Sequence, residues 1–413
     1  MGKKKNGRQA EINIGTAGHV DHGKTTLIQA LTGSWAAKHS EELRRGITIK
    51  VGYADTAIYK CLNCPPPECY TVKEECPECG GPAKLQRIVS FVDCPGHEVL
   101  MTTMLSGTAI MDGAILVVAA DEKVPQPQTR EHLAALGVIG VEKIILVQNK
   151  IELVPKDQVL ENYKQIRGFI EGTIAEDAPV IPISALHETN IDVLLETIET
   201  RMPTPKRDLS KPPRMHVVRS FDVNRPGIPA EKILGGVLGG TLQQGVFREG
   251  DELEVKPGIR IETKGRTEYR PLFSKIETLH AGGRRVEEAT CGGLVGIGTQ
   301  LDPSLTKADG LVGNTVGKPG TLPPVAEQLQ LEIHLFEQAI GTREMAKVEK
   351  IRMREPLVLN GGTAVTLGTV VGTKGEMVEF DLRRPICIDE SNRIAISRRM
   401  EDRWRLIGYG VVK

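Results

Sequence analysis

The chain has 413 residues, of which 40% are hydrophobic and 26% charged, an ordinary composition for a globular protein of two or three domains. Its 53 basic residues equal its 53 acidic residues, so the overall charge indicates no polyanionic partner, and any nucleic-acid binding must come from local patches. The sequence contains no charge-free apolar run of about 18 residues and begins without an apolar signal segment. We therefore expect no membrane-spanning helix and a cytoplasmic protein.

Residues 18–25 read Gly-His-Val-Asp-His-Gly-Lys-Thr and fit the G-x-x-x-x-G-K-[ST] pattern of phosphate-binding loops. A strand-like run precedes the pattern and a helix-like run follows it, as this loop requires; a chance glycine-rich turn is the alternative. Glycines let backbone N–H groups converge on phosphate oxygens, Lys24 is expected to reach the outer phosphates, and the Thr25 hydroxyl to bind magnesium. The nucleotide contacts predicted here are Asp21, His22, Gly23, Lys24, Thr25 and Thr26.

The first two hundred residues alternate apolar strand runs with helical patterns, which is typical of a parallel sheet covered by helices. Strands are predicted at 12–16, 88–93, 114–120, 143–148 and 180–183. Helices are predicted at 24–33, 97–109, 127–137, 156–172 and 190–201. Such a sheet binds its ligand beyond the carboxyl ends of its strands, and the next motifs fall at those ends.

Two segments are expected to sense the terminal phosphate. In the polar loop at 41–49, Thr48 is positioned to give magnesium a second hydroxyl ligand when that phosphate is present. Asp93 ends an apolar strand and can hold a magnesium-bound water, while the N–H of Gly96 can face the terminal phosphate. His97 would then lie near the attacking water, and we predict it to be the catalytic residue; a structural histidine after a turn is the alternative.

The segment 149–152, Asn-Lys-Ile-Glu, looks like a guanine-reading signature after a buried strand. The Glu152 carboxylate can accept both N–H groups of the guanine edge, although its extra methylene, where Asp is usual, changes its reach. Residues 184–186 supply a backbone N–H for the guanine carbonyl, with leucine where lysine is usual. These motifs, in this order, predict a GTP-binding domain. The predicted base contacts are Asn149, Lys150, Glu152, Ser184, Ala185 and Leu186.

Five of the eight cysteines fall within residues 61–79, which favours a metal site in a reducing compartment. Two C-x-x-C pairs can wrap a tetrahedral ion, and four thiolates leave no open position, so we predict a structural zinc site. The predicted zinc ligands are Cys61, Cys64, Cys76 and Cys79. A ligand set that uses Cys69, or a loop of free cysteines, is the alternative. Because the stretch has little to bury, zinc would substitute for a core.

A proline-rich break at 203–213 reads as a linker, and short apolar runs separated by turns follow it, as in an all-β barrel. A second break at 318–324 introduces another such series. The predicted fold is therefore an α/β P-loop GTPase domain with a zinc knuckle, followed by two all-β barrel domains. The predicted boundaries are 1–205, 206–322 and 323–413.

Residues 11–413 resemble the gamma-subunit family of archaeal and eukaryotic translation initiation factor two, a sibling of elongation factor Tu. The cysteine knuckle inside the nucleotide domain separates this family from elongation factor Tu itself. The resemblance rests on GHVDHGKT at 18–25, SEELRRGITI at 40–49, the cysteines at 61–79, DCPGHE at 93–98, NKIELV at 149–154 and RWRLIGYG at 403–410.

The resemblance implies a GTP-dependent carrier of methionyl initiator tRNA to the small ribosomal subunit, released by GTP hydrolysis. It also implies a heterotrimer with an alpha and a beta subunit, and a second magnesium ion helped by Asp21 and Gly46. Two alternatives share the layout: a GTPase subunit of a sulfate-activating enzyme, and a selenocysteine-specific elongation factor, which normally carries a further C-terminal domain.

Overall fold

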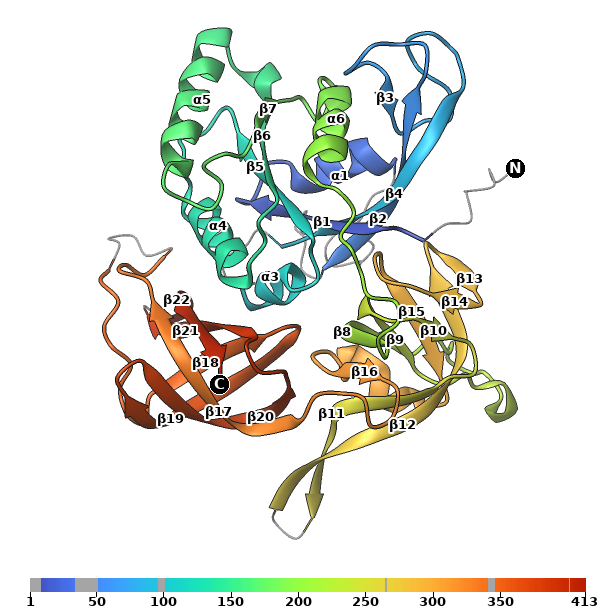
Figure 1. The fold of residues 1–413 in the computed structure, drawn as a ribbon, viewed down its shortest axis with the longest axis vertical. Helices are drawn as coiled ribbons and strands as arrows, with labels where there is room; N and C mark the ends of the chain where they lie inside the picture. Colours follow the sequence, from blue (N-terminus) through green and yellow to red (C-terminus); the bar gives the residue numbers. More distant parts are fainter. Residues whose placement is uncertain (1–8, 34–50, 96–100, 264–265, 341–345, 401) are drawn as a thin grey trace.

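The computed structural model describes residues 9–33, 51–95, 101–263, 266–340, 346–400 and 402–413. The chain forms a sheet covered by helices, followed by two β bodies that lie side by side below it in Figure 1. This architecture confirms the predicted fold class, an α/β domain followed by two β-barrels.

The first sheet has seven strands in the order β3-β2-β4-β1-β5-β6-β7. Five of them are parallel, and β2 and β3 form an antiparallel edge that the sequence analysis did not anticipate. All seven residues of β1 are buried, as expected for a strand covered on both faces. The strands are β1 (Ile12–Gly18), β2 (Gly52–Cys61), β3 (Tyr70–Thr71), β4 (Ala83–Asp93), β5 (Gly113–Ala119), β6 (Ile144–Asn149) and β7 (Val180–Pro182).

Helices cover both faces of this sheet and bury a hydrophobic core on each side. One face is covered by α1 (Lys24–Thr32) and α6 (Ile191–Arg201). The other is covered by α3 (Met101–Thr108), α4 (Pro127–Ile139) and α5 (Lys156–Ile170). A short 3₁₀ turn, η2 (Ile151–Leu153), follows β6. These helices agree with the predicted ones, and the start of the predicted 97–109 helix lies outside the described residues.

The second body is a closed antiparallel sheet in the order β11-β16-β8-β9-β15-β12-β13, completed by pairing of β11 with β12. The β11–β12 hairpin projects away from the other two bodies in Figure 1. Its elements are β8 (Arg214–Phe221), η3 (Ala230–Lys232), β9 (Val237–Gln244), β10 (Phe247–Arg248), β11 (Glu252–Thr263), β12 (Arg266–Ala281), β13 (Arg284–Val286), β14 (Glu288–Ala289), β15 (Val295–Thr299), α7 (Pro303–Thr306), η4 (Lys307–Asp309) and β16 (Thr315–Gly317).

The third body is a closed barrel in the order β17-β20-β19-β18-β21-β22, filled by its own hydrophobic core. Closure leaves its strands without free edges. Its strands are β17 (Val325–Leu335), β18 (Pro356–Gly361), β19 (Ala364–Lys374), β20 (Met377–Cys387), β21 (Arg393–Met400) and β22 (Arg403–Val412).

Each of the two β bodies contacts the N-terminal α/β body through specific side-chain bonds. Asn13 at the start of β1 accepts a hydrogen bond from the Gly293 N–H of the second body at 2.8 Å. The C-terminal barrel packs on α4, where Arg405 of β22 forms a buried ion pair with Glu131. The core around α4 continues into both β bodies, because Val218 and Leu406 belong to it. Both β bodies therefore contribute to the core on the face of the first sheet that α3, α4 and α5 cover.

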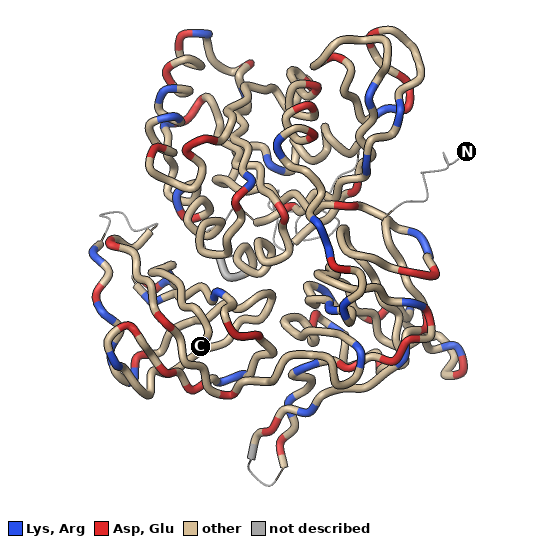
Figure 2. Tube along the Cα trace, viewed as in Figure 1, with Lys and Arg blue, Asp and Glu red and all other residues tan. Residues whose placement is uncertain are grey.

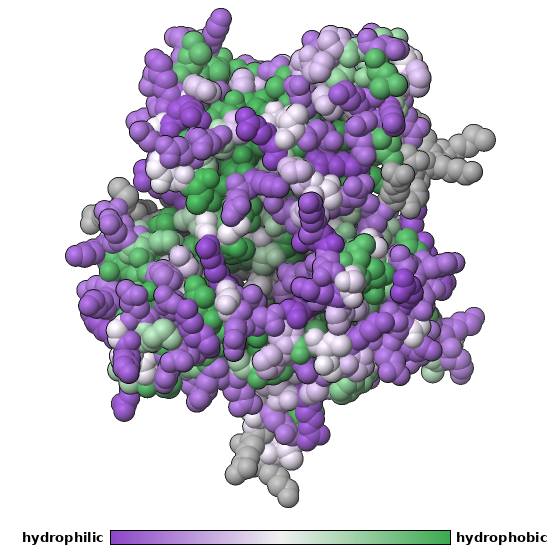
Figure 3. Space-filling view, in the orientation of Figure 1, coloured by the Kyte–Doolittle hydropathy of each residue, from purple (hydrophilic) through white to green (hydrophobic). Residues whose placement is uncertain are grey.

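Basic and acidic residues are mixed over the surface and do not separate into regions of one sign. Figure 2 shows Lys and Arg interspersed with Asp and Glu over all three bodies. In Figure 3, hydrophilic residues cover most of the visible face, with hydrophobic residues in separate groups. Within the described ranges, no helix has both the length and the apolar character needed to cross a membrane.

Candidate functional site

The loop between β1 and α1 turns sharply at two glycines. Gly18 and Gly23 have φ angles of 132° and 88°, which residues with a side chain rarely adopt. Space is also lacking: a Cβ on Gly18 would lie 2.3 Å from the Val117 carbonyl oxygen, and one on Gly23 2.3 Å from Nδ2 of Asn149. Both glycines of the phosphate-binding pattern are therefore required by backbone conformation and by close packing.

Lys24, the first residue of α1, is buried beneath this loop. Its ammonium group donates hydrogen bonds to the carbonyl oxygens of Gly18 at 3.0 Å and His19 at 2.5 Å. Burial lowers the pKa of Lys24 to about 8, against the opposing pull of the Asp93 carboxylate. A phosphate group at the helix N-terminus would supply the negative charge that favours the protonated form.

Two residues predicted to serve magnesium meet at the carboxyl end of β4. The buried Asp93 carboxylate accepts hydrogen bonds from the hydroxyl of Thr25 at 2.9 Å and from that of Thr16 at 3.1 Å. Sequence analysis missed Thr16, which pairs in register with Asp93 across the parallel strands β1 and β4. Carboxylate and hydroxyl oxygens are suitable magnesium ligands. Gly46, Thr48, Gly96 and His97, which were also predicted to sense the terminal phosphate or to serve magnesium, lie outside the described residues.

Asn149 connects the segments predicted to read the base to the phosphate loop. Its side-chain N–H donates to the His22 carbonyl oxygen at 2.9 Å, and its side-chain oxygen accepts from the Ala185 N–H at 3.0 Å. Lys150 follows with a φ of 64°, and its ammonium lies 3.9 Å from the Asp121 carboxylate. The structure therefore brings the motifs around residues 22, 149 and 185 together at one edge of the sheet.

The remaining predicted base contacts lie at the same edge. Ser184 is buried, and its hydroxyl accepts a hydrogen bond from the His187 N–H at 3.2 Å, which shapes the turn after β7. Leu186 is 68% exposed and Glu152 is also exposed. Asp21 is exposed with a φ of 63°, and Thr26 is half-buried on α1. Exposure of Glu152 leaves its carboxylate accessible to a ligand at this edge.

Two side chains of α4 hold the phosphate loop, and no sequence motif marked either of them. Nδ1 of His132 accepts a hydrogen bond from the Gly18 N–H at 2.8 Å, and Oε1 of Gln128 accepts one from the Val20 N–H at 3.3 Å. Burial lowers the pKa of His132 to about 3, so its ring is neutral and Nδ1 is free to accept. The only available signal was the spacing of four residues, which puts both side chains on one helix face.

The side chain of His22 is held by β5 and the loop after it, not by α4. Its Nδ1 lies 2.9 Å from the Val117 carbonyl oxygen and its Nε2 lies 3.4 Å from the Glu122 carboxylate. Burial lowers the pKa of His22, while the hydrogen bond to Val117 opposes the shift. The His22 ring is therefore anchored to β5 and the loop after it, which explains why a histidine stands at this buried loop position.

The four cysteines of the two C-x-x-C pairs converge at the end of the β2–β4 edge. Their Sγ atoms all lie within 4.8 Å of one another, with 3.5 Å between Cys61 and Cys79 and 3.7 Å between Cys64 and Cys76. A tetrahedral zinc ion with sulfur ligands at about 2.3 Å sets its sulfurs about 3.8 Å apart, so the cluster fits zinc. Cys69 is buried beside this group and is not one of the four, which favours the ligand set without it.

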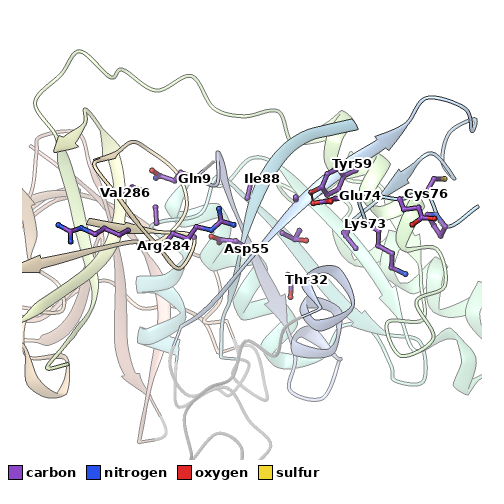
Figure 4. Close-up of a pocket in the computed structure, with 18 of the residues that line it drawn as sticks. Gln9, Thr32, Asp55, Tyr59, Lys73, Glu74, Cys76, Ile88, Arg284 and Val286 are labelled. Atoms are coloured by element: carbon purple, nitrogen blue, oxygen red, sulfur yellow. Dashed lines mark hydrogen bonds between the residues drawn. The ribbon is translucent and has the colours of Figure 1, made fainter. Parts of the chain in front are cut away.

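A separate pocket of about 800 Å³ lies between the cysteine knuckle and the second body (Figure 4). Asp55 and Tyr59 of β2 line it, with Lys73 and Glu74 of the knuckle at one end and Arg284 of β13 at the other. It carries charges of both signs and contains none of the phosphate-loop residues. The pocket is therefore distinct from the edge of the sheet that carries the phosphate loop.

Residues 9–204 match the family model described as the elongation factor Tu GTP binding domain. Residues 327–412 match the one described as initiation factor eIF2 gamma, C terminal. Proteins named translation initiation factor 2 subunit gamma are 59% identical in Pyrococcus abyssi, over the whole of both chains, and 58% identical in Archaeoglobus fulgidus, over 98% of this chain and 94% of the relative.

Solved structures agree on the fold. A bacterial selenocysteine-specific elongation factor aligns over 98% of this chain and 58% of its own length, with a TM-score of 0.74 at 23% identity. The Methanococcus maripaludis elongation factor SelB, in complex with the GTP analogue GppNHp, aligns over 98% of this chain and 79% of its own, with a TM-score of 0.72 at 22% identity. At these identities, the similarity supports the three-body fold alone.

Proposed function

Because the chain belongs to the family of translation initiation factor 2 gamma subunits, we propose that its GTP-bound form carries methionyl initiator tRNA to the small ribosomal subunit. As a member of this family the chain is a translational GTPase, and hydrolysis of GTP to GDP and phosphate would release the factor. The observation that carries the proposal is the convergence on Asn149 of the phosphate loop and the base-reading turn.

The roles of the site residues follow from this convergence. Lys24 would neutralise the outer phosphates, with the N–H groups around Gly23 and Gly96 facing their oxygens. Magnesium would be held by Thr25 and Thr48 directly and by Asp93 through water, with Asp21 and Gly46 near a second ion. Bound magnesium would neutralise charge on the phosphates. Base contacts would come from the residues predicted above: Asn149, Lys150, Glu152, Ser184, Ala185 and Leu186.

We also propose the domain boundaries, zinc site, subunit partners and location that the sequence predicted. Domain boundaries at 1–205, 206–322 and 323–413 are supported by the gaps between α6, β8, β16 and β17. We also propose a structural zinc ion in the cysteine cluster, a heterotrimer with the alpha and beta subunits of the factor, and a cytoplasmic location. Full-length identity to the gamma subunits favours this function over sulfate activation or selenocysteine delivery.

Filter binding of methionyl initiator tRNA tests the function directly. With saturating GTP the chain is expected to retain the tRNA about 5- to 150-fold more tightly than with GDP, because a switch must couple its two ligands by differential contacts. Elongator methionyl tRNA serves as the control for the carrier role. Equal retention with both nucleotides would contradict the proposal.

His97→Ala is expected to slow ribosome-stimulated GTP hydrolysis by about 10²-fold or more, because loss of a residue that orients or deprotonates the attacking water typically costs this much. Single-turnover phosphate release in the presence of small ribosomal subunits measures it, with GTP affinity unchanged. His334→Ala in the C-terminal barrel is the matched control. An unaltered rate for His97→Ala would remove the catalytic assignment.

A further inference from the structure

Helix α4 lies between the phosphate loop and the C-terminal barrel. It contacts β1 on one side and β21 and β22 on the other, and Figure 1 shows it between the first sheet and the last strands of the chain. No residue of α4 belongs to the phosphate or guanine motifs. The helix nevertheless contacts the C-terminal barrel on one side and, on another, β1, the strand that leads into the phosphate loop.

On the side of α4 that faces the phosphate loop, two side chains accept hydrogen bonds from backbone N–H groups of that loop. His132 and Gln128 lie one helical turn apart and accept hydrogen bonds from the N–H groups of Gly18 and Val20. His132 is 2% exposed, so water cannot readily replace it as acceptor. These bonds set the position of the loop before any phosphate arrives, and such pre-organisation lowers the ordering cost of binding.

The side of α4 that faces the barrel carries Glu131, the immediate neighbour of His132. Nη1 of Arg405 lies 2.5 Å from Oε1 of Glu131, and the two side chains are 7% and 3% exposed. Removing Arg405 leaves the buried Glu131 carboxylate without this counter-charge, which disfavours the packing of the barrel on α4. Glu131 and His132 are consecutive residues of α4, so a displacement of the helix at Glu131 displaces His132 as well.

We infer that Arg405 is a positioning residue for the nucleotide: by holding Glu131 it fixes α4, and α4 fixes the phosphate loop through His132 and Gln128. The inference rests on the proposed nucleotide binding at this loop. Its consequence is that docking of the C-terminal barrel sets the residence time of the nucleotide without touching it. Loosening of the barrel contact should act mainly on the dissociation rate, as most changes around a binding site do.

The barrel makes a second contact with α4 that serves as a control. Nη1 of Arg393 donates to the Gly137 carbonyl oxygen at 3.2 Å, at an exposed position more than one turn beyond His132. Arg393→Gln therefore removes a different barrel–helix hydrogen bond, made by the same kind of side chain but farther along α4 from His132. If the specific connection through Glu131 matters, this variant should leave nucleotide release nearly unchanged.

Displacement of a fluorescent GDP by excess GDP in a stopped-flow instrument tests the inference on the full chain. Arg405→Gln and Glu131→Gln are each expected to raise the release rate by about 3- to 30-fold, the range of couplings carried between packed elements. Their double variant is expected to release no faster than the quicker single variant, because both changes remove the same contact. Arg405→Lys, which keeps the charge, should be intermediate, and Arg393→Gln should stay within about twofold of the parent.

Variants of His132 test whether the effect of Arg405 reaches the phosphate loop through this side chain. His132→Leu removes the acceptor and should speed release, whereas His132→Asn keeps an acceptor near the position of Nδ1 and should retain slow release. Adding Arg405→Gln to His132→Leu should produce little further change if both act through one path. Thermal melting of each variant separates loss of folding from loosening of the loop.

The outcomes separate this inference from the proposed function. A parent protein that does not bind the fluorescent GDP would overturn the nucleotide site itself. A parent that binds, with release unchanged in folded Arg405→Gln and Glu131→Gln variants, would overturn the positioning role. Equal acceleration by Arg393→Gln, or multiplicative effects of Arg405→Gln and His132→Leu, would overturn the path through Glu131 and His132.

Discussion

Lys24→Ala is expected to weaken binding of GTP and of GDP by about 10²- to 10³-fold, which is the largest effect we predict at the nucleotide site. The ammonium of Lys24 is buried beneath the phosphate loop and donates only to loop carbonyl oxygens in the described structure. Its lowered pKa, about 8, shows the cost of keeping that charge away from water. An outer phosphate would provide the counter-charge, and alanine would leave the phosphate without it.

Isothermal titration calorimetry with each nucleotide measures this effect. Lys156→Ala, at the exposed start of α5, removes the same charge outside the phosphate loop and should leave both affinities within about twofold. Titration with ATP checks the base-reading edge in the same experiment, because parent protein that preferred neither nucleotide would contradict guanine recognition. Unchanged GTP affinity in Lys24→Ala would show that phosphates do not bind at this loop.

Cys76→Ser is expected to abolish zinc binding and unfold the knuckle carried by the β2–β4 edge. Cys76 is buried, and the four sulfurs are already grouped at separations suited to one tetrahedral ion. Structural zinc contributes on the order of 10 kcal/mol to small folded units of this kind, far more than the knuckle can gain from its few buried side chains. Loss of one ligand should therefore remove the ordered state of residues 61–82.

Metal content by elemental analysis and amide hydrogen exchange across residues 61–82 measure this loss. Cys69→Ser is the matched control, since Cys69 is buried beside the cluster and is not part of it. A strong chelator applied to the parent protein should reproduce the exchange pattern of Cys76→Ser. Retention of one zinc per chain by Cys76→Ser, together with loss in Cys69→Ser, would replace the ligand set with one that uses Cys69.

Much of the candidate site could be predicted from short sequence patterns. The motif at residues 18–25 predicted a turn at its glycines followed by the start of a helix, and the structure has both. The parallel-sheet pattern placed Asp93 and Asn149 at the ends of buried strands, where they lie in the structure. The antiparallel edge strands β2 and β3 were not anticipated. The roles of Thr48, Gly96 and His97 remain predictions, because these residues lie outside the described part of the chain.

The sequence by itself determined the phosphate loop, the guanine signature, the cysteine pairs and the two β bodies, because each depends on spacing within a short segment or on strand periodicity. Only the tertiary structure decided that Thr16 bonds Asp93, that His132 and Gln128 hold the loop, and that Arg405 pairs with Glu131. Glu131 and Arg405 are 274 positions apart. Contacts of this kind arise from the packing of whole elements, and no local pattern of residues encodes them.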